Sequence, residues 1–355
     1  MSELSDQEFK TTVIIPAYNA EKFIENCIQS IQRQTFQDFE IIVVNDGSKD
    51  GTLSVLKKLA KEDARVVIVD QENKGVSAAR NAALNQATGK YLTMVDADDD
   101  LPENALKSML DLMQDDVDLV VGSHMQVRIG KKAYIEPNME FCKAEINDNF
   151  RKVDPKIWFP WAKLFRRSVI VENGIAYDTN ISFGEDHMFN LAFIKNMTGK
   201  IVCTDRIVYN YYYLRGGLCA KYYPDMHELQ KYVLNGIISY FDGRENFPEE
   251  YLVHYTGCYL LGCFDYYIAW CSRAEAIRKV KESIKVYEDV MIHKTWEEFF
   301  PEAQLLCIKN EDYKMLVKEY IKRNPQKTIL RKYKRKVRRT LEYLLKIGLK
   351  IGVLK

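Results

Sequence analysis

Four carboxylates crowd into five positions near residue 100. The stretch YLTMVDADDDLPENAL at 91–106 runs from an apolar segment into Asp96, Asp98, Asp99 and Asp100. Like charges packed this closely repel one another unless a cation lies among them or water surrounds them. A D-x-D pair after a buried strand suits Mg²⁺ or Mn²⁺, because these ions prefer oxygen ligands and combine one or two carboxylates with phosphates. The alternative is an acidic turn that caps the following helix, and for Asp99 and Asp100 the two interpretations carry equal weight.

Short apolar strands alternate with helical segments before this cluster and just after it. Apolar runs predict strands, and apolar residues at helical spacing predict helices. The strands are expected at 11–18, 39–46, 64–71, 89–98 and 117–125, and the helices at 20–34, 48–63, 75–88 and 101–114. This alternation predicts an α/β fold with a Rossmann-like, doubly wound and mostly parallel sheet. Ligands bind such sheets beyond the carboxyl ends of the strands, where this chain has PAYNAE, VNDGSKDG, DQENKGVSAARN and DADDD.

The pattern is weaker after residue 130. We expect a lid-like segment and a helix over 158–196, and one more strand at 200–213, at an edge of the sheet. Residues 225–325 are helical in pattern and rich in aromatic side chains. The sequence therefore predicts three parts: a catalytic domain at 1–222, a helical accessory domain at 223–325 and a basic amphipathic tail at 326–355.

One helical segment, YLVHYTGCYLLGCFDYYIAWC at 251–271, is long enough to span a membrane. It contains His254 and Asp265, and a charge at bilayer depth costs about 2.5–3.5 kcal/mol on insertion scales. We expect a buried or partner-facing helix instead.

The composition suits a globular protein of two or three domains, with 355 residues of which 47% are hydrophobic and 28% charged. None of the eight cysteines forms a C-x-x-C pair, which argues against a zinc ribbon and a disulfide framework. The first ten residues, MSELSDQEFK, are polar and acidic, so we expect no secretory signal there. These features indicate a cytoplasmic protein.

The tail differs from the rest of the chain in charge. Residues 326–355 contain eleven Lys and Arg against the single acid Glu342, so that, with a net charge of +1 overall, the other 325 residues carry −9. A cationic block before leucine-rich turns favours an interfacial helix on the anionic, cytoplasmic surface of the cell membrane. The alternatives are a solvated terminal helix or a homo-oligomer contact. Nucleic acid is not an expected partner, since no nucleic-acid module accompanies the basic residues.

Other motifs accompany the D-x-D pair in a fixed order. They are P-x-Y-N, then N-D-G-S-x-D-G-T, then G-x-x-x-A-R-N, then D-x-D-D, and later FGEDHMF. Over residues 10–215 the chain closely resembles the family 2 glycosyltransferases of the GT-A fold. Those enzymes transfer a sugar from a nucleoside diphosphate with inversion, using Mg²⁺ or Mn²⁺.

The resemblance implies a nucleotide site. Tyr18 would pack near the base, Asp46 would contact the base edge, and Arg80 would reach the base or a phosphate. Asp96 would lie at the ribose and metal edge, and Asp98 would coordinate the metal. The full set of implied positions is Pro16, Ala17, Tyr18, Asn19, Asp46, Lys74, Gly75, Arg80, Asp96, Ala97 and Asp98. The structural alternatives are an Asx turn with Gly47 for Asp46, a surface ion pair for Arg80 and a plain turn for Lys74 and Gly75.

The resemblance also implies a catalytic pair, with Asp186 as the base that takes the proton of the acceptor hydroxyl and Glu185 as its neighbour. Adjacent carboxylates raise one pKa, which suits a base. The alternative is a Glu-Asp pair that serves the following helix as a dipole partner. His187 is more simply a core or surface histidine. Trp161 and Lys163 match a segment under the acceptor site, and Trp158 and Trp161 form either a sugar-stacking face or aromatic core.

The leading hypothesis is a nonprocessive, metal-dependent transferase that uses a UDP-sugar. UDP is chosen by family frequency alone. Neither the Q-x-x-R-W motif nor the transmembrane bundle of processive synthases follows the acidic motif. The expected acceptor is a glycan, lipid-linked at the cytoplasmic face of the membrane, in surface polysaccharide synthesis. The first rival, a sugar-nucleotide nucleotidylyltransferase, would carry a G-x-G-T-R loop that is missing from IPAYNAEKF. The second rival is a noncatalytic sugar- or lipid-binding protein, which would be expected to have lost the D-x-D or E-D carboxylates.

Overall fold

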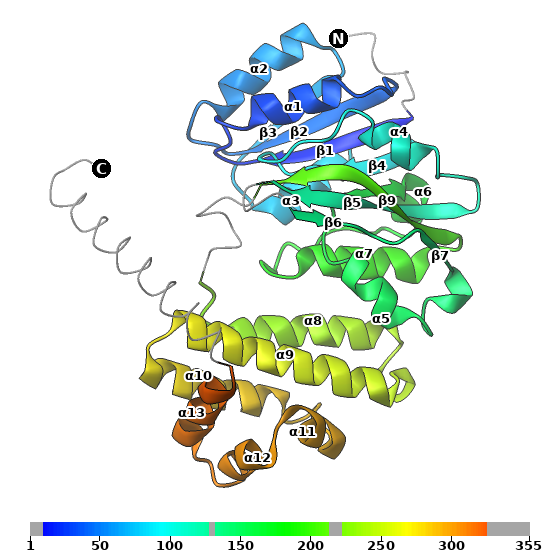
Figure 1. Cartoon of the computed structure of the whole chain (residues 1–355). Helices are drawn as coiled ribbons and strands as arrows, with labels where there is room; N and C mark the ends of the chain where they lie inside the picture. The colour runs from blue at the N-terminus through cyan, green and yellow to red at the C-terminus, as the bar shows by residue number, and fades with distance from the viewer. Residues whose placement is uncertain (1–9, 128–131, 213–221, 325–355) are drawn as a thin grey trace, which may run out of the picture. The chain divides into compact units, whose positions relative to one another are not determined.

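The computed structural model describes residues 10–127, 132–212 and 222–324 (Figure 1). The chain divides after residue 220 into two compact units. The predicted tail at 326–355 lies outside the described residues.

The first unit is built on a nine-stranded sheet with helices on its faces (Figure 1). Its strands are β1 Thr11–Ala17, β2 Phe39–Asp46, β3 Val66–Gln71, β4 Tyr91–Met94, β5 Val117–Gln126, β6 Lys132–Tyr134, β7 Met139–Cys142, β8 Lys163–Arg166 and β9 Lys200–Tyr211. Its α-helices are α1 Ile24–Gln32, α2 Thr52–Glu62, α3 Val76–Leu84, α4 Ala105–Leu110, α5 Phe150–Val153, α6 Arg167–Glu172 and α7 Glu185–Asn196. The strand order is β3-β2-β1-β4-β8-β5-β9-β7, with β6 paired to β5.

The half of the sheet formed by β3, β2, β1 and β4 is entirely parallel. All eight residues of β2 are buried, as expected for an apolar run covered on both faces. The register pairs Ala17 with Asn45 and Asp46 with Gln71, so these strands end at one edge and the loops that follow them converge there. The predicted α/β fold with a mostly parallel, doubly wound sheet is confirmed.

The other half of the sheet is mixed and departs from two predictions. The strand expected at an edge, β9, lies between β5 and β7, so its predicted edge position is wrong. Its outer neighbour β7 has only four residues, too few to show an alternating pattern. Likewise β8, inside the segment expected to be lid-like, pairs antiparallel with both β4 and β5. Its four residues begin with Lys163 and end with Arg166. Because only the two residues between these charges are apolar, the sequence shows no strand pattern here.

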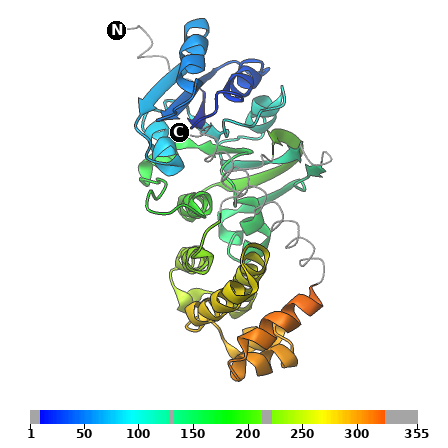
Figure 2. The same ribbon diagram turned by 90° about the vertical axis from the view of Figure 1, so that its left-hand side faces the viewer.

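Apolar side chains from α1 and α2 form one core with the sheet. Ile28 of α1 and Leu56 of α2 are fully buried and belong to the same cluster as Val13 and Ile15 of β1. Helix α3 contacts β1 and β2 separately from this cluster, and Figure 2 shows helices on both sides of the strands. Helices therefore cover both faces of the sheet, in three layers.

The second unit is helical. It contains α8 Met226–Tyr240, α9 Glu249–Trp270, α10 Arg273–Tyr287, α11 His293–Phe299, α12 Glu302–Lys309 and α13 Tyr313–Arg323. The predicted buried helix is α9, whose residues Tyr251, Leu260 and Tyr267 lie in the core of this unit. Within the described ranges, no helix has both the length and the apolar character needed to cross a membrane.

Candidate functional site

The loops that follow β2 and β3 are joined through Asp46. Its Oδ1 accepts hydrogen bonds from Gln71 Nε2 and from the Lys74 backbone N–H, both at 2.8 Å. Its Oδ2 accepts from the Gly75 N–H at 2.9 Å. The carboxylate is buried, and these bonds lead to the last residue of β3 and to the loop after it, rather than to an Asx turn with Gly47. Asp46 therefore fixes the Lys74–Gly75 turn, and its contact with a nucleotide base stays a prediction.

Gly47 lets the same two loops approach each other closely. Its φ is +67°, a conformation that residues with a Cβ rarely adopt, and a Cβ there would lie 2.5 Å from the Asn73 backbone nitrogen. The Asn73 side chain also donates to the Asp46 carbonyl at 3.0 Å. The glycine of the N-D-G-S motif is thus required by backbone packing.

The P-x-Y-N loop after β1 packs against the start of the S-x-D-G-T segment. Asn19 has a φ of +50°, and its Oδ1 accepts from the Lys49 N–H at 2.8 Å while its own N–H donates to Ser48 Oγ at 3.0 Å. Tyr18, next to it, remains 50% exposed. The structure thus brings the first two motifs together and leaves the Tyr18 ring open to a planar ligand.

The four carboxylates near residue 100 divide into two pairs. Asp99 accepts from Tyr209 Oη and from the Tyr212 N–H, both at 2.7 Å. Asp100 accepts from Asn210 Nδ2 at 2.7 Å. Helix α4 begins only at Ala105, so neither carboxylate caps it. Asp99 and Asp100 instead anchor β9 to the loop after β4.

Asp96 and Asp98 form the pair that is open to a ligand. Asp96 is bound by Arg80, whereas Asp98 makes no ion pair with any described residue. Burial, with a further contribution from Asp96, raises the pKa of Asp98 to about 6. Ala97 between them is buried. The loop after β4 therefore holds more negative charge than the residues around it neutralise.

This pair fits a divalent cation shared with a diphosphate. Within the ranges that the structure describes, no group of three His, Cys, Asp or Glu side chains could hold a metal ion by itself. Two carboxylates are nevertheless the usual protein contribution to Mg²⁺ when phosphate oxygens and water complete the octahedron. The added positive charge would also relieve the excess negative charge at Asp98.

Arg80 connects the carboxylate loop to α7. Its Nη1 donates to Asp186 Oδ1 at 2.6 Å, and its Nη2 donates to Asp96 Oδ1 at 3.2 Å. The guanidinium is 4% exposed. The contact of Arg80 with a base or phosphate stays a prediction, and the ion pairs that Arg80 forms are buried rather than on the surface.

Glu185 and Asp186 occupy the first turn of α7, directly after Gly184 with its left-handed φ of +81°. Carboxylates in the first turn are stabilised by the helix dipole. Burial nevertheless raises the pKa of Asp186, while Arg80 opposes the rise and Glu185 adds to it. Among the described residues, no hydrogen-bond donor to Asp186 Oδ2 is found, so this oxygen remains able to accept a proton.

His187 of α7 and Trp161 are core residues. His187 is fully buried, its Nε2 lies 2.8 Å from Asp154 Oδ1, and its ring stacks on Trp158. Trp161 is 6% exposed and stacks on Phe159 and Tyr209. Burial lowers the pKa of the Lys163 ammonium to about 8. Trp161 thus has no exposed indole face, so the sugar-stacking interpretation is not supported at this residue.

Comparison with known proteins identifies this part of the chain. The sequence model described as "Glycosyl transferase family 2" matches residues 12–174, which include every motif except the Glu185–Asp186 pair. This part of the chain belongs to the family 2 glycosyltransferases. The matched residues span β1 to β8 and include the Asp96–Asp98 pair, whereas α7 and β9 lie beyond them.

The relatives are bacterial glycosyltransferases. The chain is 34% identical over 188 residues to "Uncharacterized glycosyltransferase EpsJ" of Bacillus subtilis, covering 51% of this chain and 55% of that protein. It is 34% identical over 217 residues to "Poly(ribitol-phosphate) beta-glucosyltransferase" of Bacillus spizizenii, covering 58% of this chain and 32% of that protein. The chain thus spans about half the length, or less, of these curated relatives.

A solved structure shares the fold over a longer stretch. "S. aureus TarS 1-349 in complex with UDP-GlcNAc" aligns with a TM-score of 0.64 and 21% identity, covering 88% of this chain and 92% of that one. At this identity the likeness shows a common fold.

Two residues of the first unit escaped the sequence analysis. Tyr209 donates to Asp99, and its Oη accepts from the Asp96 N–H at 3.1 Å. Tyr177 lies beneath Arg80, with 5.2 Å between the ring centroid and Cζ. Neither stands in a recognisable motif, although the YNYYY run at 209–213 marks an aromatic strand end.

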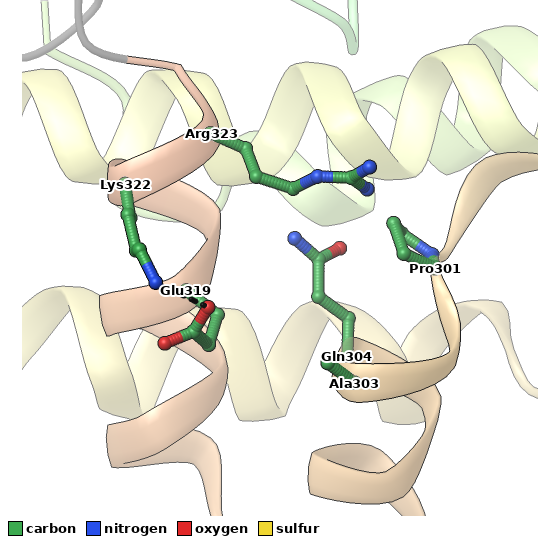
Figure 3. A pocket seen from close by; sticks show the side chains of 6 residues that line it. All are labelled: Pro301, Ala303, Gln304, Glu319, Lys322 and Arg323. Atoms are coloured by element: carbon green, nitrogen blue, oxygen red, sulfur yellow. Dashed lines mark ion pairs between the residues drawn. The ribbon is translucent and has the colours of Figure 1, made fainter.

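The helical unit has a hollow of its own, of about 390 Å³, between α12 and α13. Figure 3 shows the side chains of Gln304 and Arg323 turned toward one another across it, and Lys322 beside Glu319 at 4.0 Å. The lining is completed by Pro301 and Ala303. These residues contain no arrangement of nucleophile, base or paired carboxylates, so the hollow is not a candidate for the chemistry of the glycosyltransferase domain.

Proposed function

We propose that the chain is an inverting, metal-dependent glycosyltransferase that transfers a single sugar from a UDP-hexose or UDP-N-acetylhexosamine to a hydroxyl of a glycan acceptor. The observation that carries this proposal is the bridge made by Arg80, which joins Asp96 of the carboxylate loop to Asp186 at the start of α7. This bridge connects a candidate diphosphate site to a candidate base. Membership in the family 2 glycosyltransferases supports the reaction class.

The donor side would be formed by the converging loops. Tyr18 offers an exposed ring for the base, and Lys74 and Gly75 lie in the turn that Asp46 fixes. Asp96 and Asp98 would hold Mg²⁺ or Mn²⁺, which when bound neutralises the charge of the diphosphate leaving group. The TarS complex with UDP-GlcNAc supports the choice of UDP.

The acceptor side would use Asp186 as general base. Arg80 occupies Oδ1, so Oδ2 is the atom that takes the proton of the acceptor hydroxyl. The hydroxyl oxygen attacks the anomeric carbon opposite the diphosphate and forms the new C–O bond. The bond from the anomeric carbon to the diphosphate oxygen breaks, and UDP leaves with the electron pair. The pKa of Asp186, raised by burial, makes this carboxylate a stronger base than one in water.

The acceptor class and location are proposed from the relatives and the sequence. A relative is named for the transfer of glucose to poly(ribitol-phosphate), which supports a role in surface polysaccharide synthesis. The eleven Lys and Arg of 326–355 favour the cytoplasmic surface of the membrane, where a lipid-linked acceptor would be found. Flotation with anionic liposomes tests this part: the full chain should float and a chain ending at residue 325 should not. Equal flotation of both would remove the membrane role of the tail.

The reaction itself is tested with a panel of UDP-sugars. The expected result is UDP release that requires Mn²⁺ or Mg²⁺ and stops with EDTA, and a product whose anomeric configuration, read by NMR, is opposite to that of the donor. Retention of configuration would contradict inversion. If no donor turns over and UDP binds equally with and without metal, a noncatalytic binding protein becomes the better account. Release of pyrophosphate from a nucleoside triphosphate would instead favour a nucleotidylyltransferase.

A further inference from the structure

Tyr177 lies in the loop between α6 and α7, outside any helix or strand, yet it is 3% exposed. No motif marks it. Its backbone, ring and hydroxyl contact three elements of the first unit: α3, which carries Arg80, α7, which carries Asp186, and β4, which leads into the loop with Asp96.

The first contact is with α3. The Asn81 side chain donates from Nδ2 to the Tyr177 carbonyl and accepts the Tyr177 N–H at Oδ1, both at 2.8 Å. Arg80, the neighbouring residue on the helix, places its guanidinium 5.2 Å from the centre of the Tyr177 ring. Such a distance is within the range of a cation–π contact. Asn81 thus fixes the backbone of the residue whose ring contacts Arg80.

The second contact is with α7. The Tyr177 ring stacks on Phe189 with 4.2 Å between centroids and 4° between planes. Phe189 follows Asp186 by three residues, so both lie on one face of the helix. The stack therefore fixes the helix that carries Asp186 relative to the ring under Arg80.

The third contact is with the end of β4. The Tyr177 hydroxyl donates to Met94 Sδ at 2.7 Å, and Met94 is the last residue of the strand, two positions before Asp96. The Tyr177 side chain therefore contacts Arg80 of α3, Phe189 of α7 and Met94 at the end of β4.

Among the described residues, the Arg80 guanidinium is hydrogen-bonded only at its outer nitrogens. Its two Nη atoms bond to carboxylates in a loop and at a helix terminus, while its buried Nε has no hydrogen-bond partner among the described residues. The Tyr177 ring therefore adds a contact to the guanidinium that the two carboxylates do not provide.

We propose that Tyr177, held by Asn81, is a positioning residue that aligns the Arg80 guanidinium between Asp96 and Asp186, and this inference rests on the proposed function. Tyr177 does not touch the reacting atoms. It acts through Arg80, because a tilted guanidinium would release the Asp186 carboxylate from the orientation in which Oδ2 faces the acceptor. A displacement of about 1 Å at such a group lowers turnover by up to about a hundredfold.

The test compares Tyr177→Leu with Tyr91→Leu. Tyr91 is a matched control, because it is also 3% exposed and has Arg166 Cζ 5.7 Å from its ring, but it lies at the opposite end of β4 from Asp96. The expected result for Tyr177→Leu is a kcat lowered about tenfold or more with donor KM within about twofold of wild type. Tyr91→Leu should keep the kcat of the folded fraction. Equal kcat losses in the two variants would mean that Tyr177 only stabilises the fold, which overturns the proposal.

A double-mutant cycle with Arg80→Gln distinguishes positioning from an independent effect. If Tyr177 acts through Arg80, adding Tyr177→Leu to Arg80→Gln lowers kcat no further. Multiplicative losses would overturn the proposal. If Tyr177→Leu does not fold, Asn81→Ala replaces it in this cycle with Arg80→Gln. Asn81→Ala removes the bonds to the Tyr177 backbone but keeps the Tyr177 ring.

A crystal structure of Tyr177→Leu, or of Asn81→Ala, gives a readout that does not depend on turnover. The proposal expects Arg80 to lose at least one of its two carboxylate bonds. Retention of both at their present lengths overturns it. If the wild-type chain shows no turnover, the proposed function fails, while this structural comparison still decides the role of Tyr177.

Discussion

Arg80 donates a 2.6 Å hydrogen bond to Asp186, although 106 positions separate the two residues in the chain. The same guanidinium reaches Asp96, so one buried cation serves two carboxylates from different elements. Burial raises the pKa of Asp186 and Arg80 lowers it, which means that the charge state of the candidate base depends directly on this contact. The predictions below follow from this arrangement and from the loops around it.

The pH dependence of turnover should report the raised pKa of Asp186. A general base must be ionised, so kcat should fall as the pH decreases through this pKa, with an acid limb well above the usual range of an aspartate. In Arg80→Gln the pKa should rise further, because the cation that favours the charged form is gone, and the limb should move to higher pH. The measurement is kcat against pH at saturating donor and metal.

Arg65→Gln is the control for that profile, because Arg65 pairs with Asp63 and not with Asp186. Its acid limb should coincide with that of the wild type. A limb in Arg80→Gln that does not move, or that moves to lower pH, would contradict the assignment of Asp186 as the base coupled to Arg80.

Asp98→Asn should reduce metal-dependent binding of UDP. Asp98 makes no ion pair with a described residue, so the loss of its charge removes a ligand without breaking a protein contact. We expect the dissociation constant of UDP with Mn²⁺ to rise about tenfold or more, and the value in EDTA to change little. Isothermal titration with and without metal provides both values.

Asp100→Asn is the matched variant two positions away. Asp100 accepts from Asn210, so its substitution should lower the melting temperature while leaving the effect of Mn²⁺ on UDP binding intact. If Asp100→Asn and Asp98→Asn lost the metal effect equally, the division of the four carboxylates into two pairs would be wrong.

Gly47→Ala should be more damaging than Gly174→Ala. Both glycines have left-handed φ values, +67° and +59°, so each substitution costs about 1–2 kcal/mol of backbone strain. Only at Gly47 would the new Cβ also meet backbone, 2.5 Å from the Asn73 nitrogen, whereas the space around Gly174 is open within 4 Å. Thermal melts should show the larger loss for Gly47→Ala, and UDP affinity should fall in that variant alone. Equal losses would show that the loops after β2 and β3 can separate without cost.

Asp63→Asn should destabilise the chain at neutral pH but not in acid. Hydrogen bonds from the Arg65 side chain lower the pKa of Asp63 to about 2, below its value in the unfolded chain. A lowered pKa means that the stabilisation is fully present above about pH 4 and is lost as the pH falls toward 2. We expect a loss of about 1 kcal/mol in the free energy of unfolding at pH 7, because the pair is partly exposed.

The control for Asp63 is Glu62→Gln, a change of the exposed carboxylate next to it. Denaturant unfolding at pH 7 and at pH 3 should show a gap between the two variants that narrows in acid. A gap that is constant with pH would contradict the charged Arg65–Asp63 contact as its source.

The parallel half of the sheet could be predicted from its apolar runs. A strand that is buried on both faces has a nearly continuous apolar sequence, as in FEIIVVND of β2. The same logic located the loops, since ligand-binding segments follow such strands. Strands β7 and β8 could not be predicted, because each has only four residues, too few to show a period.

The site was predictable in its residue types and only partly in its contacts. The two roles open for Asp99 could not be resolved from sequence, because its partner Tyr209 lies 110 positions later. The expected contact of Arg80 with a base or phosphate stays a prediction, whereas its hydrogen bond to Asp186 could not be read from the sequence because 106 positions separate the two residues. Tyr177 had no sequence signal, because a single tyrosine in a loop resembles any other.

The central claim, that donor binding and proton removal belong to separate carboxylates, is tested most directly by Asp186→Asn. The measurement is the dissociation constant of the UDP-sugar with Mn²⁺ together with the rate of UDP release. We predict a dissociation constant within about twofold of wild type and a turnover lower by about a hundredfold or more. Turnover close to wild type, or a loss of donor affinity as large as that of Asp98→Asn, would contradict the assignment of Asp186 as the base.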